Sequence, residues 1–66
     1  MQCGQIIKQL RLEKGETQEQ LGSAIGVTSM AISKYESGDA TPNDENKAKI
    51  ARHFKKSVEF IFFNTD

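Results

Sequence analysis

The stretch that decides the fold runs from Thr17 to Gly38 and reads TQEQLGSAIGVTSMAISKYESG. It holds two short segments with apolar residues at helical spacing, and each begins with a threonine that can cap a helix. Thr17 and Gln20 have the spacing of a capping box, in which each side chain accepts from the other residue's backbone N–H. Gly26 stands between the segments, where a tight turn needs the left-handed conformation that glycine adopts readily. The stretch therefore predicts two helices joined by a glycine turn.

Both predicted helices are short and amphipathic. The second is predicted over Ser29–Glu36, with Thr28 as its N-cap and Gly38 just past its end. Two helices joined by a short turn that contains glycine cross steeply, which leaves the second helix projecting from the surface. The residues expected to face inward from this pair are Leu21, Ala24, Ile25, Ile32 and Tyr35.

The outward face of the projecting helix carries side chains that can read DNA bases. Hydroxyl groups at Ser29 and Ser33 can bond either donor or acceptor edges of bases. Lys34 can donate to the O6/N7 pair of guanine, and Met30 can lie against the methyl group of thymine. The same side chains would also suit a solvated helix face, so their chemistry alone leaves both interpretations open.

Three further helices are predicted outside this stretch. Apolar residues at helical spacing before Gly15 indicate a first helix, and Pro42 opens a fourth. Ser57 caps a fifth helix, predicted over Val58–Phe62. Their core residues are expected to be Ile6, Ile7, Leu10, Ala48, Ile50, Ala51, Phe54, Val58, Ile61 and Phe62. The sequence thus predicts an all-α fold, a compact bundle of five short helices in one domain over residues 1–66.

Composition sets limits on function. The chain has nine basic and nine acidic residues and a formal net charge of zero, whereas a typical DNA-binding domain is basic. Its single cysteine, Cys3, and single histidine, His53, allow neither an internal disulfide nor a structural zinc site of four ligands. Neither a nucleophile–base pair nor a glycine-rich phosphate loop is recognisable. We therefore expect a protein that is not an enzyme and needs no cofactor, metal or small-molecule ligand.

The sequence also gives expectations for location and for several single residues. No apolar run approaches the roughly 20 residues of a membrane span, and no signal-peptide pattern is present, so we expect a cytoplasmic domain with no membrane partner. Cys3 is expected to be a half-buried or frayed terminal thiol, and His53 a surface residue beside Phe54. A basic cluster can either contact phosphate or form a solvated helix face, which is the favoured interpretation. It comprises Lys47, Lys49, Arg52, His53, Lys55 and Lys56.

The central stretch closely resembles the helix-turn-helix of the Cro/repressor-type (XRE-like) DNA-binding family. The similarity rests on TQEQLG at 17–22, the GV turn at 26–27, ISKYESG at 32–38, Pro42 and KIARHFKKSVEFIF at 49–62. It covers nearly the whole chain, from about Gly4 to Phe62. The resemblance implies a five-helix, lambda-repressor-like DNA-binding domain that binds a double-stranded DNA operator. The helix over residues 29–36 would lie in the major groove, as in the repressors that define this docking geometry.

The resemblance implies a role in base recognition for the projecting helix. Ser29, Met30 and Lys34 match the positions that face bases in this family, and Ser33 lies close to them. These are the residues whose chemistry already suited base edges. The preceding helix would cross the phosphate backbone and orient the protein on DNA.

Other residues match positions that hold the domain on phosphate or brace it. Gln18 matches a position that bonds a phosphate, and Thr28 and Ser37 match positions near the phosphates. Arg11 and Glu36 match a pair that forms a salt bridge in some members and would tie the first helix to the recognition helix. Such a pair adds little stability when it is exposed, whereas the loss of one partner from a partly buried pair would be several times more destabilising.

Two features need separate interpretation. Asp39 follows the recognition helix, at a position where basic residues of family members often contact phosphate. Its carboxylate should repel DNA unless it caps a loop amide. Phe60 and Phe63 lack an obvious core partner on the short last helix. They either fold back on the first or fourth helix or form an apolar patch for a two-fold dimer contact, as this family often does.

The sequence as a whole predicts a sequence-specific, double-stranded DNA-binding transcriptional regulator, specifically a repressor that acts as a homodimer through Phe60 and Phe63. The alternative is a protein-interaction module, such as an antitoxin or adaptor, that uses the same fold without DNA. Zero net charge and Asp39 favour that alternative, whereas the polar outward face of the projecting helix disfavours it.

Overall fold

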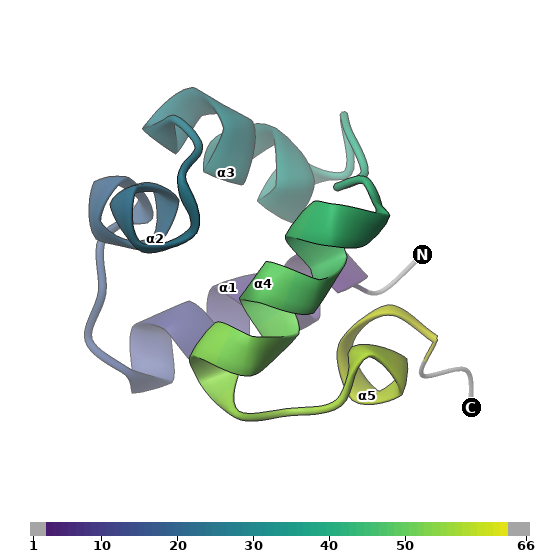
Figure 1. Ribbon diagram of the computed structural model, residues 1–66. Helices are drawn as coiled ribbons and strands as arrows, with labels where there is room; N and C mark the ends of the chain where they lie inside the picture. Colours follow the sequence, from purple (N-terminus) through teal and green to yellow (C-terminus); the bar gives the residue numbers. More distant parts are fainter. Residues whose placement is uncertain (1–2, 64–66) are drawn as a thin grey trace.

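The computed structural model describes residues 3–63, which form five helices and contain no strand (Figure 1). The helices are α1 (Cys3–Glu13), α2 (Gln18–Ile25), α3 (Ser29–Ser37), α4 (Asp44–Phe54) and α5 (Val58–Phe62). The predicted all-α bundle of five short helices is confirmed. α3 ends one residue later than predicted, and α4 begins after Pro42 because the Asn43 side chain supplies its N-cap.

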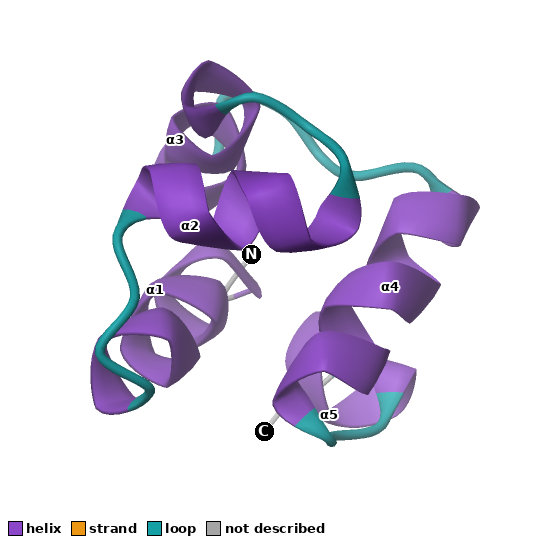
Figure 2. Cartoon of the chain, turned by 60° about the vertical axis from the view of Figure 1, so that its left-hand side comes forward, coloured by secondary structure: helices purple, strands orange, loops and turns teal. Residues whose placement is uncertain are grey.

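The turn between α2 and α3 forms as the sequence predicts. Thr17 Oγ1 accepts from Gln20 N at 3.0 Å and Gln20 Oε1 accepts from Thr17 N at 2.8 Å, so both halves of the capping box are present. Gly26 ends α2 with φ of 82°, and Thr28 Oγ1 then accepts from Ala31 N at 3.1 Å to begin α3. Figures 1 and 2 show the resulting steep crossing of α3 over α2.

The buried face of α2 differs from the predicted one at a single residue. Leu21 and Ile25 are buried, but Ala24 is exposed and Gly22 is buried in its place. The chain folds back over α2 at Gly22, where an added Cβ would lie 2.6 Å from the Val27 carbonyl oxygen. Ala24 was assigned to the core from helical spacing, which takes no account of this close backbone contact.

The core receives one almost fully buried branched side chain from each helix. These residues are Ile7, Leu21, Ile32, Ile50 and Ile61, none more than 1% exposed. Cys3 is also buried, which corrects the expectation of a half-buried or frayed thiol. The reason is that α1 already begins at Cys3, and Gly4 packs directly on the backbone of α3, where an added Cβ would lie 2.5 Å from the Glu36 carbonyl oxygen.

α4 connects two opposite ends of the molecule. It begins beside the C-terminal end of α3 and runs to the end where α5 packs, so that α3 and α5 lie far apart (Figure 1). His53, near the end of α4, is half-buried and not a surface residue as predicted. Its Nε2 lies 2.8 Å from Oε2 of Glu16, which belongs to the loop between α1 and α2. Within residues 3–63, no helix has the length and apolar character needed to cross a membrane.

Candidate nucleic-acid interface

α3 presents the four residues predicted to face bases on the side opposite the core. This α3 surface comprises Ser29, Met30, Ser33 and Lys34, all of them exposed. Met30 is 66% exposed, which leaves its side chain available for contact. Ile32 and Tyr35 are buried on the other side of the helix and fix its rotation. The fold therefore displays the four side chains together on one helix.

The two hydroxyl groups predicted near phosphates, on Thr28 and Ser37, lie at the ends of α3 and differ in what they can still donate. Thr28 Oγ1 accepts from Ala31 N, so its own proton remains free to donate to a phosphate oxygen. Ser37 Oγ donates to the Lys34 carbonyl at 3.2 Å and accepts from Asp39 N at 3.4 Å. Since a hydroxyl has one proton, Ser37 could contact phosphate as a donor only by giving up its bond to Lys34.

Gln18 stands at the N-terminus of α2, where the helix dipole favours an anion. Its side chain is half-buried, and Nε2 donates to Oε1 of Glu36 at 3.1 Å. No local pattern predicts this bond, because the two residues are 18 positions apart and belong to different helices. The side chain predicted to bind phosphate is thus anchored to the C-terminal part of α3.

Arg11 and Glu36 form a buried bidentate ion pair between α1 and α3. Arg11 Nε lies 2.7 Å from Glu36 Oε2, and Nη2 donates to Oε1 at 3.2 Å. The two side chains are 9% and 5% exposed. Arg11 Nη1 also donates to the Glu16 carbonyl at 2.8 Å, which ties in the loop before α2. Removing either charged partner would leave the other buried and unpaired, the costly case for an ion pair.

A groove beside the α3 surface adds candidate residues that sequence reasoning missed. Met30 and Lys34 line one side, and Thr41 and Asn43 from the loop before α4 line the other. The Ala40 backbone N–H donates to the Lys34 carbonyl at 3.2 Å, which holds this loop against α3. Hydroxyl and amide groups here can bond bases or phosphates. No local signal marks them, because their position depends on how the loop folds back.

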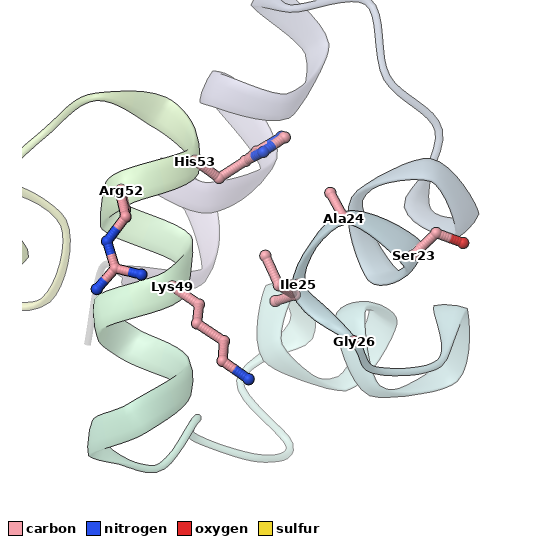
Figure 3. A pocket seen from close by; sticks show the side chains of 7 residues that line it. All are labelled: Ser23, Ala24, Ile25, Gly26, Lys49, Arg52 and His53. Carbon is pink, nitrogen blue, oxygen red and sulfur yellow. The ribbon is translucent and has the colours of Figure 1, made fainter.

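Most cations of the chain lie away from the α3 surface, where Lys34 is the one basic residue. A second groove, between the end of α2 and α4, is lined by Ser23, Ala24, Ile25, Gly26, Lys49, Arg52 and His53 (Figure 3). Figure 3 shows Lys49 and Ile25 extending into the space between the two helices. Part of the basic cluster, which is expected to form a solvated helix face, therefore lines this groove.

The two phenylalanines of the last helical turn remain at the surface. Phe60 is 45% and Phe63 58% exposed, so neither ring folds back into the core. Lys56 Nζ lies 5.4 Å from the centre of the Phe60 ring, and Lys47 Nζ lies 5.3 Å from that of Phe63. These are cation–π contacts at exposed sites, which are weak. The apolar patch on α5 is therefore still available for another contact.

This geometry can be compared with known proteins. A family model described as a helix-turn-helix matches residues 7–61, most of the chain. The chain belongs to the Cro/repressor-type helix-turn-helix family. Among solved structures, the P22 c2 repressor in complex with a synthetic operator superposes with a TM-score of 0.87 and is 29% identical. The match covers 89% of each of the two chains, so the similarity in fold extends over most of this chain.

Two sequence relatives differ in how much of their own length the match covers. The transcriptional activator BcrR of Enterococcus faecalis is 39% identical over 59 residues, which are 89% of this helix-turn-helix chain but 29% of BcrR. YgzD of Bacillus subtilis, an uncharacterised helix-turn-helix regulator, is 35% identical over 57 residues, 86% of each chain. The chain thus matches only a part of BcrR and most of YgzD.

Proposed function

We propose that this helix-turn-helix protein is a sequence-specific transcriptional regulator that binds a double-stranded DNA operator as a homodimer, each subunit contributing one such domain. The observation that carries the proposal is the α3 surface, a row of polar, flexible and cationic side chains on a helix that the capped turn holds out from the core. The same motif in the P22 c2 repressor was solved on operator DNA, which supports the same partner here.

In this proposal α3 lies in the major groove and the N-terminus of α2 faces the phosphate backbone. Ser29, Met30, Ser33 and Lys34 read base edges. Gln18 and Thr28 donate to phosphate oxygens and set the register of the protein on the duplex. Ser37 is a weaker candidate for the same role, because its proton is used within α3. Cytoplasmic location, expected from the sequence, belongs to the same proposal.

Repression is the mode of regulation that we propose. The P22 c2 chain solved on its operator is named a repressor, and the match covers 89% of that chain and 89% of this one. BcrR is named an activator, but the match covers only 29% of it, so its activity can depend on segments outside the matched region. A domain that occupies an operator can repress by blocking access to DNA without any further part.

Dimerisation through α5 is the second element of the proposal. Only Lys34 supplies positive charge on the α3 surface, so a single subunit gains little from phosphate neutralisation. Joining two subunits that each read a half-site makes the second contact intramolecular and raises the overall affinity. Phe60 and Phe63 offer the exposed apolar patch that a two-fold contact needs.

Selection of bound sites from a pool of random duplexes tests the proposal directly. We expect enrichment of a two-fold symmetric site whose half-sites are separated by about one helical turn, 10 base pairs or so. The selected duplex should bind at least about 1,000-fold more tightly than random duplex at the same salt concentration. Enrichment of no common sequence would contradict sequence-specific binding.

A protein-interaction module remains the second candidate function, and the charge layout favours it. The cations gather on α4, including Lys49 and Arg52 in the groove of Figure 3, whereas the carboxylate of Asp39 is exposed just after α3. Binding of random-sequence duplex at about 50 and about 200 mM salt separates the candidates, because even a few phosphate contacts make affinity fall as the salt concentration rises. A DNA-binding domain should bind at the lower concentration, and a pure interaction module should bind at neither.

A further inference from the structure

The bond between Gln18 and Glu36 links the phosphate-facing end of α2 to the end of the recognition helix. Gln18 Nε2 donates to Glu36 Oε1 at 3.1 Å, and both side chains are at least half-buried. An unanchored glutamine samples many rotamers, and ordering it on binding costs free energy. The bond therefore removes part of that cost before DNA arrives.

The anchored amide keeps a donor for DNA. A glutamine side chain carries two N–H protons on Nε2, and Gln18 donates one of them in its hydrogen bond to Glu36. The second proton remains for a phosphate oxygen. The bond also fixes which way the amide is turned, since the carboxylate accepts only from the nitrogen. A reversed amide would present its oxygen to the phosphate, and two acceptors repel.

The negative charge of a carboxylate beside a phosphate site must be neutralised, and the guanidinium of Arg11 neutralises that of Glu36. Glu36 receives two bonds from the guanidinium, at 2.7 and 3.2 Å, and its side chain is 5% exposed. The pair is therefore neutral as a unit and shields DNA from the charge of Glu36. Arg11, Glu36 and Gln18 form one hydrogen-bonded chain across α1, α3 and α2.

We propose that Glu36 is a positioning residue for DNA binding: its carboxylate, neutralised by Arg11, orients the amide of Gln18 toward a backbone phosphate. This inference rests on the proposed function, because it concerns the same interface. It predicts that Gln18 contributes to DNA affinity only while Glu36 holds it.

A double-mutant cycle with the selected duplex tests this coupling. Gln18→Ala in the natural chain should weaken binding by about tenfold, the effect of one hydrogen bond to a charged group. The background Arg11→Met/Glu36→Met removes the anchor and both charges together, which avoids an unpaired buried charge. In that background Gln18→Ala should weaken binding by no more than about twofold, since the unanchored amide has already lost its contribution.

Lys34→Ala is the matched control, because Lys34 lies on the same helix as Glu36 but has no bond to it. Its fold-loss of affinity should be equal in both backgrounds, which shows that α3 still sits correctly on DNA. Equal losses for Gln18→Ala in both backgrounds would overturn the positioning role. Failure of the natural chain to prefer the selected duplex would instead overturn the proposed function.

The side-chain amide signals of Gln18 give a measurement that needs no DNA, and its decisive comparison is made in the natural chain. In the natural chain, NMR should show two well-separated Nε2 protons with slowed exchange, compared with the exposed Gln5 as reference. In the Arg11→Met/Glu36→Met background the Gln18 signals should move to the positions of Gln5. Signals of Gln18 that already match those of Gln5 in the natural chain would overturn the inference.

Discussion

Lys34 is the single positive charge on the α3 surface, so its replacement should be informative about base reading. Lys34→Ala should cost about 1–3 kcal/mol of operator binding and relax the preference at one base pair, if its ammonium donates to guanine. Affinities for the selected duplex and for single-base-pair variants of it would measure both effects. Lys8→Ala, on the exposed side of α1, is the control and should change neither.

An equal loss of affinity for every DNA sequence would mean that Lys34 contacts a phosphate and that neighbouring side chains recognise the bases. The distinction matters because phosphate contacts position a protein whereas base contacts specify the site. Met30 and the two serines of the α3 surface would then have to supply the specificity between them.

The Arg11–Glu36 pair should respond differently to the loss of one partner and to the loss of both. Arg11→Ala should lower the free energy of unfolding by about 3–5 kcal/mol, because Glu36 stays buried without its partner. Arg11→Met with Glu36→Met should be close to neutral, since two apolar side chains replace two compensated charges. Urea unfolding followed by circular dichroism measures both. Equal destabilisation by the two variants would mean that packing, and not charge, sets the cost.

At the scale of elements, the close contact between α2 and the turn depends on the absence of a side chain at Gly22. Gly22→Ala would place a Cβ 2.6 Å from the Val27 carbonyl oxygen and 3.1 Å from the carbonyl carbon of Thr28. Both neighbours are backbone, so the turn must shift, and we expect a loss of about 1–3 kcal/mol. Thermal or urea unfolding would check it. Ser23→Ala, exposed on the same helix, should stay within about 0.5 kcal/mol of the natural chain.

A neutral or stabilising Gly22→Ala would show that the turn can move away from α2 at no cost. The DNA assay would then decide whether α3 has moved with it, because Lys34 and Met30 would meet the base pairs in a different register. Stability and affinity together thus separate a tolerant turn from a displaced recognition helix.

Helix boundaries follow from local signals, and those are what the sequence carries. Capping residues hydrogen-bond to backbone groups only a few positions away, as at Thr17, Thr28 and Ser57. The caps predicted for α2, α3 and α5 are therefore the ones that the structure shows. The start of α4 is less sharply marked, because Pro42 and Asn43 both signal a helix start and only the Asn43 side chain accepts the capping bond.

Contacts between helices could not be predicted from local signals. The bond of Gln18 to Glu36 and that of His53 to Glu16 each join residues far apart in the chain, and nothing in the sequence marks the partners. The α3 surface was predictable because a short capped helix fixes which residues point outward. The groove formed with Thr41 and Asn43 was not, since it depends on the path of a loop.

For the whole molecule, zero net charge and the separation of its cations from α3 define how it can bind DNA. Each neutralised phosphate adds about 0.9 to the slope of log affinity against log salt, so few cations at the interface mean a shallow dependence. Weak electrostatic attraction lowers affinity for random DNA and leaves selectivity to base contacts. An interface of this kind gains most from pairing two subunits, for which Phe60 and Phe63 offer an exposed apolar patch.

Removal of the apolar patch on α5 should therefore separate folding from assembly. Phe60→Ser with Phe63→Ser should yield monomers by light scattering and weaken operator binding by at least about 100-fold, the usual range of a lost bivalent gain. The fold should survive, because both rings are exposed. Leu12→Ser is the matched control: Leu12 is 57% exposed on α1 and should leave assembly unchanged. An intact dimer after the double substitution would place the interface elsewhere, and monomers from Leu12→Ser would move it to α1.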